Sequence, residues 1–489
     1  MKFLVISNIS VLLAALPLWS GPQRTLYNSL DPCSCAEALA FCELYPESEE
    51  TPSALKRAAG LLHLSSTETV PSLFSLINRL KGASEPFSEK DLIFIESLAA
   101  HFPNRQLKGY GAQTEAEVIA LPTEEIDLGI ALILSQLGTA ADAVFQASSY
   151  SAMLDLMALQ IMSRLSSNAT HMQKIHETNR FIFEQMHFRF PPHSVYAENI
   201  DLYTFLPSVM DNHLGVCLGV TALYLAVAQR IDLPLEIITP PGHIYIRYRM
   251  GDKTLNIETT ARGVHMSDDT YLSLHNPTLQ ERPLKEVVGM THVNQASTYL
   301  HKGEFLKAAQ IYEKALPYMP ADPLVKELLG YSYLFTGRKD EGETLLKQIG
   351  KGMHSIAEDY LAGKVDLDGI QAVFTMVDET RQSLIEKQKK LESTLEKYPE
   401  FRDGLHQLAT TWVQLNRARE AIDALTRFYA LDPDDAVTNY YLCVLHGERH
   451  DFKNCWRYLR CAEAAVAKEH FYPKALRDLR RSLILLCPE

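Results

Sequence analysis

One short segment of the chain holds the residue types that nucleophilic catalysis uses, in a compact order. Cys217 follows Gly215 and Val216, His243 follows the run Pro240-Pro241-Gly242, and Glu258 precedes two threonines. A thiol beside an imidazole can become a nucleophilic thiolate, and a carboxylate beside that imidazole holds its tautomer and stabilises its charged form. The three residue types therefore predict a nucleophile, a general base and an orienting residue.

The cysteine is predicted to begin a helix. Val220, Leu223, Tyr224, Val227 and Ile231 recur at helical spacing after it, and Asp232-Leu233-Pro234 stops the pattern. At a helix N-terminus, unpaired backbone N–H groups and the positive end of the helix dipole favour thiolate over thiol. Because the helix is apolar nearly all round, we expect it to be the buried central helix of its domain.

The histidine and the glutamate are predicted to lie on one β-hairpin. Residues 243–248 and 254–259 alternate about the turn Met250-Gly251-Asp252-Lys253, after a strand-like run over 235–239. With the turn centred between Gly251 and Asp252, one face carries Ile244, Ile246, Tyr248, Leu255, Ile257 and Thr259, and the other carries His243, Tyr245, Arg247, Asn256 and Glu258. In that register His243 and Glu258 are diagonal neighbours, about 7–8 Å apart at the backbone, and their side chains can meet.

These motifs resemble the Cys, His, Asp order of the transglutaminase-like superfamily, and more closely its bacterial branch coupled to tetratricopeptide repeats. The resemblance covers about residues 124–290 for the domain and most of the remainder for the repeats. It implies an α+β papain-like fold and acyl transfer from a protein or peptide amide. It also implies that Cys217 is the nucleophile, His243 the general base and acid, and Glu258 the orienting carboxylate, where the superfamily usually has Asp.

Each of these residues also has a simpler interpretation. Cys217 fits a packing residue on an apolar helix, His243 a capped residue at a strand end, and Glu258 a partner for Arg247 on the same hairpin face. Asn212 is a weaker candidate, as an oxyanion donor beside the backbone N–H of Cys217. His213 is interpreted as a surface loop residue.

A helical repeat of about 34 residues can be followed past residue 290. Small residues must fall where the two helices of such a repeat cross, and a proline closes the unit. The first pair of units carries Tyr299, Gly303, Ala308, Tyr312, Ala315 and Pro320, then Gly330, Tyr333, Gly337 and Gly342. The second pair carries Leu408, Ala409, Trp412, Ala421, Leu425 and Pro433, then Leu442, Cys443, Leu459 and Ala462. The charged residues 356–400 between them are interpreted as a degenerate repeat or spacer, and an irregular helical bundle is the alternative.

The first half of the chain suggests a leader followed by short helices. Residues 1–21 carry Lys2, a mostly apolar run and then small residues, the layout of a signal peptide or membrane-tethering segment; a buried first helix is the alternative. Residues 22–123 are predicted to form a helical region and linker, 124–290 the α+β domain with helices near 126–138 and 151–165, and 291–489 the repeats. Cys33, Cys35 and Cys42 are predicted to be buried thiols of a helical cap, with a bridge among them conceivable after export.

Composition narrows the functional classes further. The 489 residues are 46% hydrophobic and 22% charged, ordinary for folded domains, and the net charge of −13 with no basic stripe argues against a nucleic-acid partner. The sequence carries no motif for a metal or a nucleotide, so we expect no cofactor. The repeats predict a protein or peptide partner on their concave face, the N-terminal segment a possible membrane tether, and the leader favours export or envelope association over the cytoplasm.

Two functions fit these patterns. The first is a cysteine-dependent hydrolase or acyltransferase acting on protein or peptide amide bonds, with the repeats docking a substrate or partner. The second is an adaptor without catalysis, in which a degenerate transglutaminase-like scaffold stands beside a repeat array that binds a partner.

Overall fold

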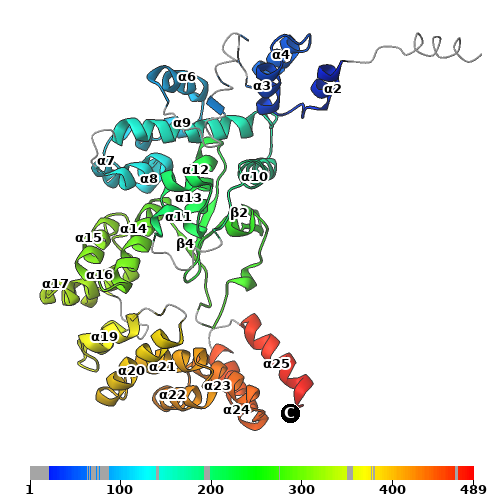
Figure 1. Ribbon diagram of the computed structural model, residues 1–489. Coiled ribbons are helices and arrows are strands. Elements are labelled where there is room, and N and C mark those ends of the chain that lie inside the picture. Colours follow the sequence, from blue (N-terminus) through cyan, green and yellow to red (C-terminus); the bar gives the residue numbers. More distant parts are fainter. Residues whose placement is uncertain are drawn as a thin grey trace, which may run out of the picture. The chain divides into compact units, whose positions relative to one another are not determined.

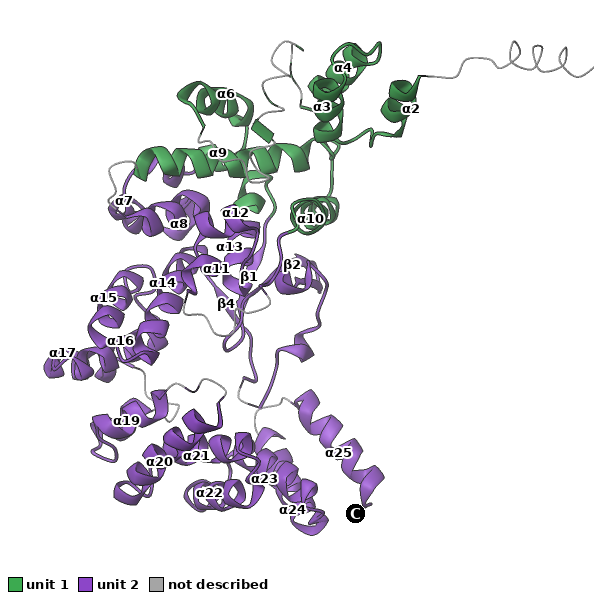
Figure 2. Ribbon diagram, in the orientation of Figure 1, with its two compact units in different colours: residues 1–106, 139–187, 226–233 green, residues 107–138, 188–225, 234–489 purple. Residues whose placement is uncertain are grey.

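The computed structural model describes residues 21–488, apart from residues 63, 65–66, 68–72, 74–75, 78–86, 139–142, 192–198, 275, 350–355, 376, 378–379 and 468–471 (Figure 1). The predicted leader thus lies outside the described residues except for Gly21. The chain divides into two compact units, unit 1 with residues 1–106, 139–187 and 226–233, and unit 2 with residues 107–138, 188–225 and 234–489 (Figure 2).

Unit 1 is helical, as expected for the first part of the chain. The long helix α9 packs on α6, and α3 packs on α4. α9 starts eight residues earlier than predicted, because the apolar positions Ala143 and Ala147 extend its buried face toward the N-terminus. The helices of unit 1 are α2 (Pro22–Ser29), α3 (Cys35–Leu44), α4 (Thr51–Leu61), α6 (Glu89–Ala99), α9 (Ala143–Met162) and α10 (His171–Asn179), with the short 3₁₀ turn η1 (Pro103–Gln106) and the π-helical segment η4 (Arg180–Gln185).

A buried carboxylate on α9 joins two arginines of unit 1. Asp155 accepts from Arg230 Nε at 2.7 Å and from both terminal nitrogens of Arg105 at 2.8 and 2.5 Å. Arg230 is 0% exposed and Asp155 2%. Charged side chains buried this fully are stable only when they are paired and hydrogen-bonded. Each side chain of this cluster therefore depends on the others.

The sheet of unit 2 is antiparallel, with strand order β3-β2-β1-β4. Ile246 pairs with Ile257 and Arg247 with Asn256, which confirms the register predicted from a turn centred between Gly251 and Asp252. The three-residue strand β4 was not predicted, since Gln-Glu-Arg carries no apolar alternation. The strands are β1 (Glu236–Thr239), β2 (Tyr245–Met250), β3 (Lys253–Ile257) and β4 (Gln280–Arg282).

Helix α13 (Cys217–Arg230) begins at Cys217, as the sequence predicted. Leu218, Val220, Leu223, Tyr224 and Val227 are all buried, so α13 is the apolar central helix that we expected. The predicted helix near 126–138 is α8, which Asp127 caps by accepting from Ile130 N at 2.9 Å and which ends at Gly138. The nearby elements are η2 (Lys108–Gly111), α7 (Glu115–Ala120), η3 (Thr123–Glu125), α8 (Leu128–Leu137), α11 (Asp201–Thr204), α12 (Leu206–Asn212), η6 (Thr259–Ala261) and η7 (Asp268–Thr270).

The C-terminal helices of unit 2 pack as consecutive pairs at the predicted repeats. α14 packs on α15, α16 on α17, α21 on α22 and α23 on α24. Gly342 lies at one crossing, where a Cβ would approach the carbonyl oxygen of Gly330 to 2.8 Å, so only glycine lets the helices come this close. The helices are α14 (Leu284–His301), α15 (Phe305–Ala315), α16 (Pro323–Phe335), α17 (Lys339–Lys347), α18 (Ile356–Leu361), α19 (Leu367–Phe374), α20 (Arg381–Lys397), α21 (Arg402–Gln414), α22 (Ala418–Leu431), α23 (Ala436–Glu448), α24 (Phe452–Ala467) and α25 (Lys474–Leu486).

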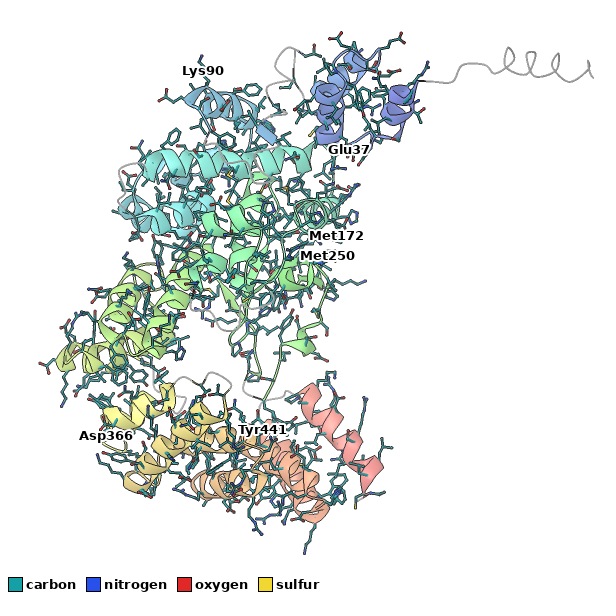
Figure 3. All side chains as sticks on the ribbon, viewed as in Figure 1. Glu37, Lys90, Met172, Met250, Asp366 and Tyr441 are labelled. Carbon is teal, nitrogen blue, oxygen red and sulfur yellow. The ribbon has the colours of Figure 1, made fainter. Side chains whose placement is uncertain are left out.

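The stretch between the two predicted repeat pairs contains the helices α18, α19 and α20. Asp366, labelled in Figure 3, caps α19 through Gly369 N at 3.0 Å and also binds the Lys397 ammonium at the end of α20. α20 packs in turn on α21. The segment therefore continues the helical stack into the second pair of repeats.

The cysteines are all present as free thiols. The prediction of three buried thiols holds for Cys35, whereas Cys33 is exposed and Cys42 is only partly buried. Among the residues that the structure describes, none of the helices combines the length and hydropathy that crossing a membrane requires.

Candidate active site

Cys217 takes the first position of α13. The carbonyl of Val216 accepts the first helical hydrogen bond, from Val220 N at 3.1 Å, and Val216 N donates to the carbonyl of Tyr203 at 2.9 Å. A Cβ on Gly219 would collide with that same carbonyl oxygen, so glycine is needed for the helix start to lie this close to α11. The N–H groups of a first helical turn have no intrahelical acceptor, and Cys217 is half-buried among them.

His243 stands between the cysteine and the glutamate. It follows a tight turn in which His243 N donates to the carbonyl of Pro240 at 3.0 Å and Gly242 has a φ of +70°. Its Nε2 lies 2.7 Å from Oε2 of Glu258, and the nearby side chain of Cys217 helps to raise the pKa of the ring. Because Glu258 occupies Nε2, Nδ1 is the ring nitrogen left for Cys217.

Glu258 is fixed by four donors. Thr260 donates its backbone N–H and its hydroxyl to Oε1, at 3.0 and 2.6 Å. Oε2 receives Tyr271 Oη at 2.5 Å and His243 Nε2. Burial alone would raise the pKa of Glu258, but hydrogen bonds from His243, Thr260 and Tyr271 and the charge of His243 lower it to about 2. The residue is therefore a fully bonded carboxylate, held in one position.

Tyr271 and Thr260 are site residues that the sequence reasoning missed. The Tyr271 ring stacks on His243 at a centroid distance of 5.7 Å and on Tyr245 at 4.2 Å. Burial and the neighbouring Glu258 raise the pKa of Tyr271 far above its usual value, so it stays a donor. Thr260 could have been noticed, because a threonine two residues after a carboxylate often bonds it locally, whereas nothing in the sequence ties Tyr271 to Glu258.

Arg247, the alternative partner predicted for Glu258, binds other side chains instead. Arg247 binds Asp268 Oδ1 at 2.6 Å and Asn256 Oδ1 at 2.8 Å. The suggestion that Glu258 pairs with Arg247 is therefore wrong, since Asp268, on the loop after the hairpin, supplies the nearer carboxylate. Arg247 also donates to Tyr245 Oη at 3.1 Å, so the arginine supports the aromatic stack instead.

One buried hydrogen bond ties the helix of Cys217 to the strand of Glu258. Thr221, one turn after Cys217, lies with its Oγ1 2.9 Å from Oγ1 of Thr259, the neighbour of Glu258. Both threonines are buried. This contact fixes the start of α13 relative to the hairpin end, which sets the position of the thiol relative to the imidazole.

The two flanking candidates lie at the end of α12. Asn212 is exposed, and its amide donates to the carbonyl of Ser208 at 2.8 Å. His213 has a φ of +55° and stacks on Phe188 with ring centroids 4.6 Å apart. The Asn212 amide thus donates within its own helix, and the backbone N–H of Cys217 is the other candidate oxyanion donor.

The arrangement can carry out nucleophilic catalysis. A thiol at a helix start, an imidazole near it and a carboxylate that accepts four hydrogen bonds behind the imidazole are the parts that acyl transfer through a thioester needs. Within the described part of the chain, no three His, Cys, Asp or Glu side chains gather in a way that could hold a metal ion.

The charge state of His243 gives a testable pH dependence. Burial lowers the pKa of His243, but its interactions with Cys217 and with the carboxylate of Glu258 raise it to about 10. The paired imidazolium therefore contributes its full stability below the ordinary value of 6.5, and this contribution is lost as the pH rises through about 10. The ionised Glu258 contributes its full stability above pH 4.5, and this contribution is lost as the pH falls through about 2.

We expect nitrogen-15 NMR to find both ring nitrogens of His243 protonated at neutral pH, with a midpoint near 10. Glu258→Gln removes the charge and weakens one hydrogen bond, so the midpoint should fall in that variant. A wild-type midpoint near 6.5 would show that the imidazole is not paired with charged neighbours.

Comparisons with known proteins find a transglutaminase-like domain in the middle of the chain. Residues 148–296 match the family model described as the Transglutaminase-like superfamily. Two proteins of Xylella fastidiosa named UPF0162 protein, from strains Temecula1 and 9a5c, are each 23% identical, over 198 and 189 residues that cover 36% and 34% of this chain. The matched region spans 66% and 63% of those two proteins, slightly less than two thirds of their length.

Several solved repeat proteins are similar to the helical part of the chain. TTC0263, a thermophilic TPR protein of Thermus thermophilus, is 17% identical with a TM-score of 0.23, over 40% of this chain and 99% of that one. YrrB, described as a TPR protein with an unusual peptide-binding site, is 14% identical with a TM-score of 0.22, over 40% of this chain and 92% of that one. In this chain the repeats are defined by its own helix pairs, from α14–α15 to α23–α24.

Proposed function

We propose that the transglutaminase-like domain of this chain is a cysteine-dependent hydrolase or acyltransferase that acts on protein or peptide amides. One observation carries the proposal: the imidazole of His243 lies 2.7 Å from the carboxylate of Glu258, close enough to Cys217 for that side chain to raise the pKa of the ring. A packing cysteine and a capping histidine have no need of this alignment, nor of a carboxylate with four donors.

In the first step, Sγ of Cys217 attacks the carbonyl carbon of the amide and forms a tetrahedral oxyanion. The backbone N–H of Cys217 supports the oxyanion, and His243 gives its proton to the leaving nitrogen as the carbon–nitrogen bond breaks. A thioester on Cys217 and a free amine, or ammonia from a glutamine, are the products of this step.

In the second step, His243 removes a proton from the acyl acceptor, which then attacks the thioester. Water gives a carboxylic acid, and a primary amine gives a new amide; in both cases the Cys217 sulfur leaves as a thiolate and His243 keeps the proton, which restores the starting pair. Glu258 stays ionised throughout and stabilises the imidazolium that is present before the first step and forms again in the second.

The repeats are proposed to dock a protein or peptide, either the substrate or a partner that delivers it. Stacked helix pairs such as α14–α15 and α16–α17 present a continuous surface on which an extended peptide can lie. If the repeats dock and Cys217 catalyses, the wild type and Cys217→Ala should capture the same partner equally. Only the wild type should then process the substrate that this partner delivers. Capture with no processing by either protein would favour the adaptor function.

Export or envelope association is proposed from the layout of residues 1–21. Fractionation of cells that express the full chain tests it directly. Recovery outside the cytoplasm supports the proposal, and recovery in the cytoplasm contradicts it.

A panel of amide substrates tests the proposed activity. Glutamine-containing peptides are incubated with the full chain, with and without a primary amine, and followed by ammonia release, amine incorporation and peptide-bond cleavage. We expect at least one readout to depend on His243 and to survive His301→Ala, which changes an exposed histidine in the repeats. If the His243→Ala variant retains full turnover, His243 does not take part in the reaction.

A further inference from the structure

The end of the repeat region carries a basic surface beside an exposed apolar helix end. α24 and α25 together hold seven Lys and Arg residues against two acidic ones, in a chain whose net charge is −13. The described part of this region therefore differs in sign from the chain as a whole, and such asymmetry points to an anionic binding partner.

The basic residues surround a surface pocket of about 620 Å³. Lys453, Arg457 and Arg460 line it, and none of the described residues lining it is acidic. Trp456 forms part of the wall and donates its indole N–H to the carbonyl of Cys487 at 2.9 Å. The guanidinium of Arg480 lies 5.7 Å from the Trp456 ring and forms an ion pair with Glu463 at 2.8 Å, so the positive charge of this surface rests on the residues of α24 that line the pocket.

Three consecutive aliphatic residues directly precede the pocket-lining residues Cys487 and Pro488 in the sequence. Leu483 is buried and anchors α25, whereas Ile484, Leu485 and Leu486 are 46%, 85% and 70% exposed. The next residues, Cys487 and Pro488, line the pocket. Isolated exposed leucines are common, but three in a row at the end of a helix form a contiguous apolar surface that calls for a partner.

We propose that this surface, made of Lys453, Arg457, Arg460, Ile484, Leu485 and Leu486, binds an anionic lipid surface. The aliphatic side chains enter the boundary between headgroups and acyl chains while the basic side chains bind the headgroup phosphates, as in other interfacial helices. A helix end that presents leucines this exposed suits insertion into a lipid layer, whereas a peptide would need a groove that covers them.

Charge argues against a second copy of the chain as the occupant. A twofold contact through this surface would place the same arginines and lysine opposite one another, and like charges at close range oppose association. An acidic protein surface would form ion pairs with the basic residues but would leave the aliphatic residues without an apolar surface to pack against.

Vesicle sedimentation of the full chain tests the proposal. Vesicles of phosphatidylcholine with about one third phosphatidylglycerol are compared with pure phosphatidylcholine, and we expect binding at least about tenfold tighter to the anionic vesicles, weakening as salt is added. Leu485→Asp with Leu486→Asp, and separately Lys453→Glu with Arg457→Glu, should each weaken binding about tenfold or more.

Matched controls sit on α6 of unit 1. Ile93→Asp changes a leucine-sized side chain that is 71% exposed, and Lys90→Glu changes an exposed lysine, labelled in Figure 3, on the same helix. Both controls should bind as the wild type does. Since every variant keeps residues 1–21, attachment through that segment would leave all of them equal.

Three results would overturn the proposal. Equal binding to neutral and anionic vesicles would show that the basic residues do not attract the lipid. Binding that is unchanged in both surface variants would show that another part of the chain contacts the lipid. Polyglutamate that binds the wild type but not Lys453→Glu/Arg457→Glu, in the absence of vesicle binding, would assign the surface to an acidic protein.

Discussion

Cys217→Ala should reduce turnover of any amide substrate that the chain accepts by about 10³-fold or more, because the thioester can no longer form. The fold should be retained, since Cys217 is only half-buried and alanine is well suited to the first turn of a helix. The measurement is the initial rate in the assays proposed above, together with circular dichroism and the thermal midpoint of each variant.

Cys33→Ala is the matched control for this loss. Cys33 is an exposed free thiol, and its replacement should leave turnover unchanged. Activity retained by Cys217→Ala would mean that another group is the nucleophile, and the proposed reaction would then be wrong for this chain. Activity lost together with the helical signal would point to folding, and the milder Cys217→Ser variant separates the two causes.

Asp155→Ala should destabilise unit 1 by about 3–5 kcal/mol, because it leaves buried cations without their carboxylate. Arg230 is completely buried, and it also donates to two neutral groups, the carbonyl of Ala226 at 2.9 Å and Ser151 Oγ at 3.1 Å. Arg105 keeps a second carboxylate, Glu96 at 2.7 Å, so the larger part of the loss falls on Arg230. Urea unfolding followed by fluorescence and circular dichroism measures the change.

An exposed ion pair provides the comparison for Asp155. Lys474 and Asp478 lie one turn apart on α25 and form a pair whose side chains are largely exposed. Asp478→Ala should cost less than about 1 kcal/mol, since solvent screens such pairs. If Asp155→Ala costs no more than Asp478→Ala, water reaches Arg230 and the cluster is not the buried network described here.

The local geometry of the site could be predicted because short-range rules determine it. The Gly251–Asp252 turn fixes which residues of the hairpin face one another, so the nearness of His243 and Glu258 followed from the alternation alone. The start of α13 at Cys217 followed in the same way from apolar spacing and from the stop at Pro234.

Contacts between distant segments could not be predicted. Tyr271 reaches Glu258 from a loop whose course depends on tertiary packing, and Asp155 meets Arg230 across 75 positions of sequence. The Arg247 partner was misjudged for the same reason, because the sequence displays the hairpin neighbours but not Asp268 on the following loop. Strand β4 was missed since pairing with β1, rather than side-chain pattern, makes it a strand.

The rate at which iodoacetamide alkylates Cys217 tests the central claim most directly. Cys33, an exposed thiol in the same molecule, serves as the internal reference, and tryptic mass spectrometry reads both residues at once. An imidazolium beside the sulfur should make Cys217 react faster than Cys33 at about pH 6, and His243→Ala should remove that advantage. Alkylation of Cys217 that is no faster than that of Cys33, or that is unaffected by His243→Ala, would contradict the account.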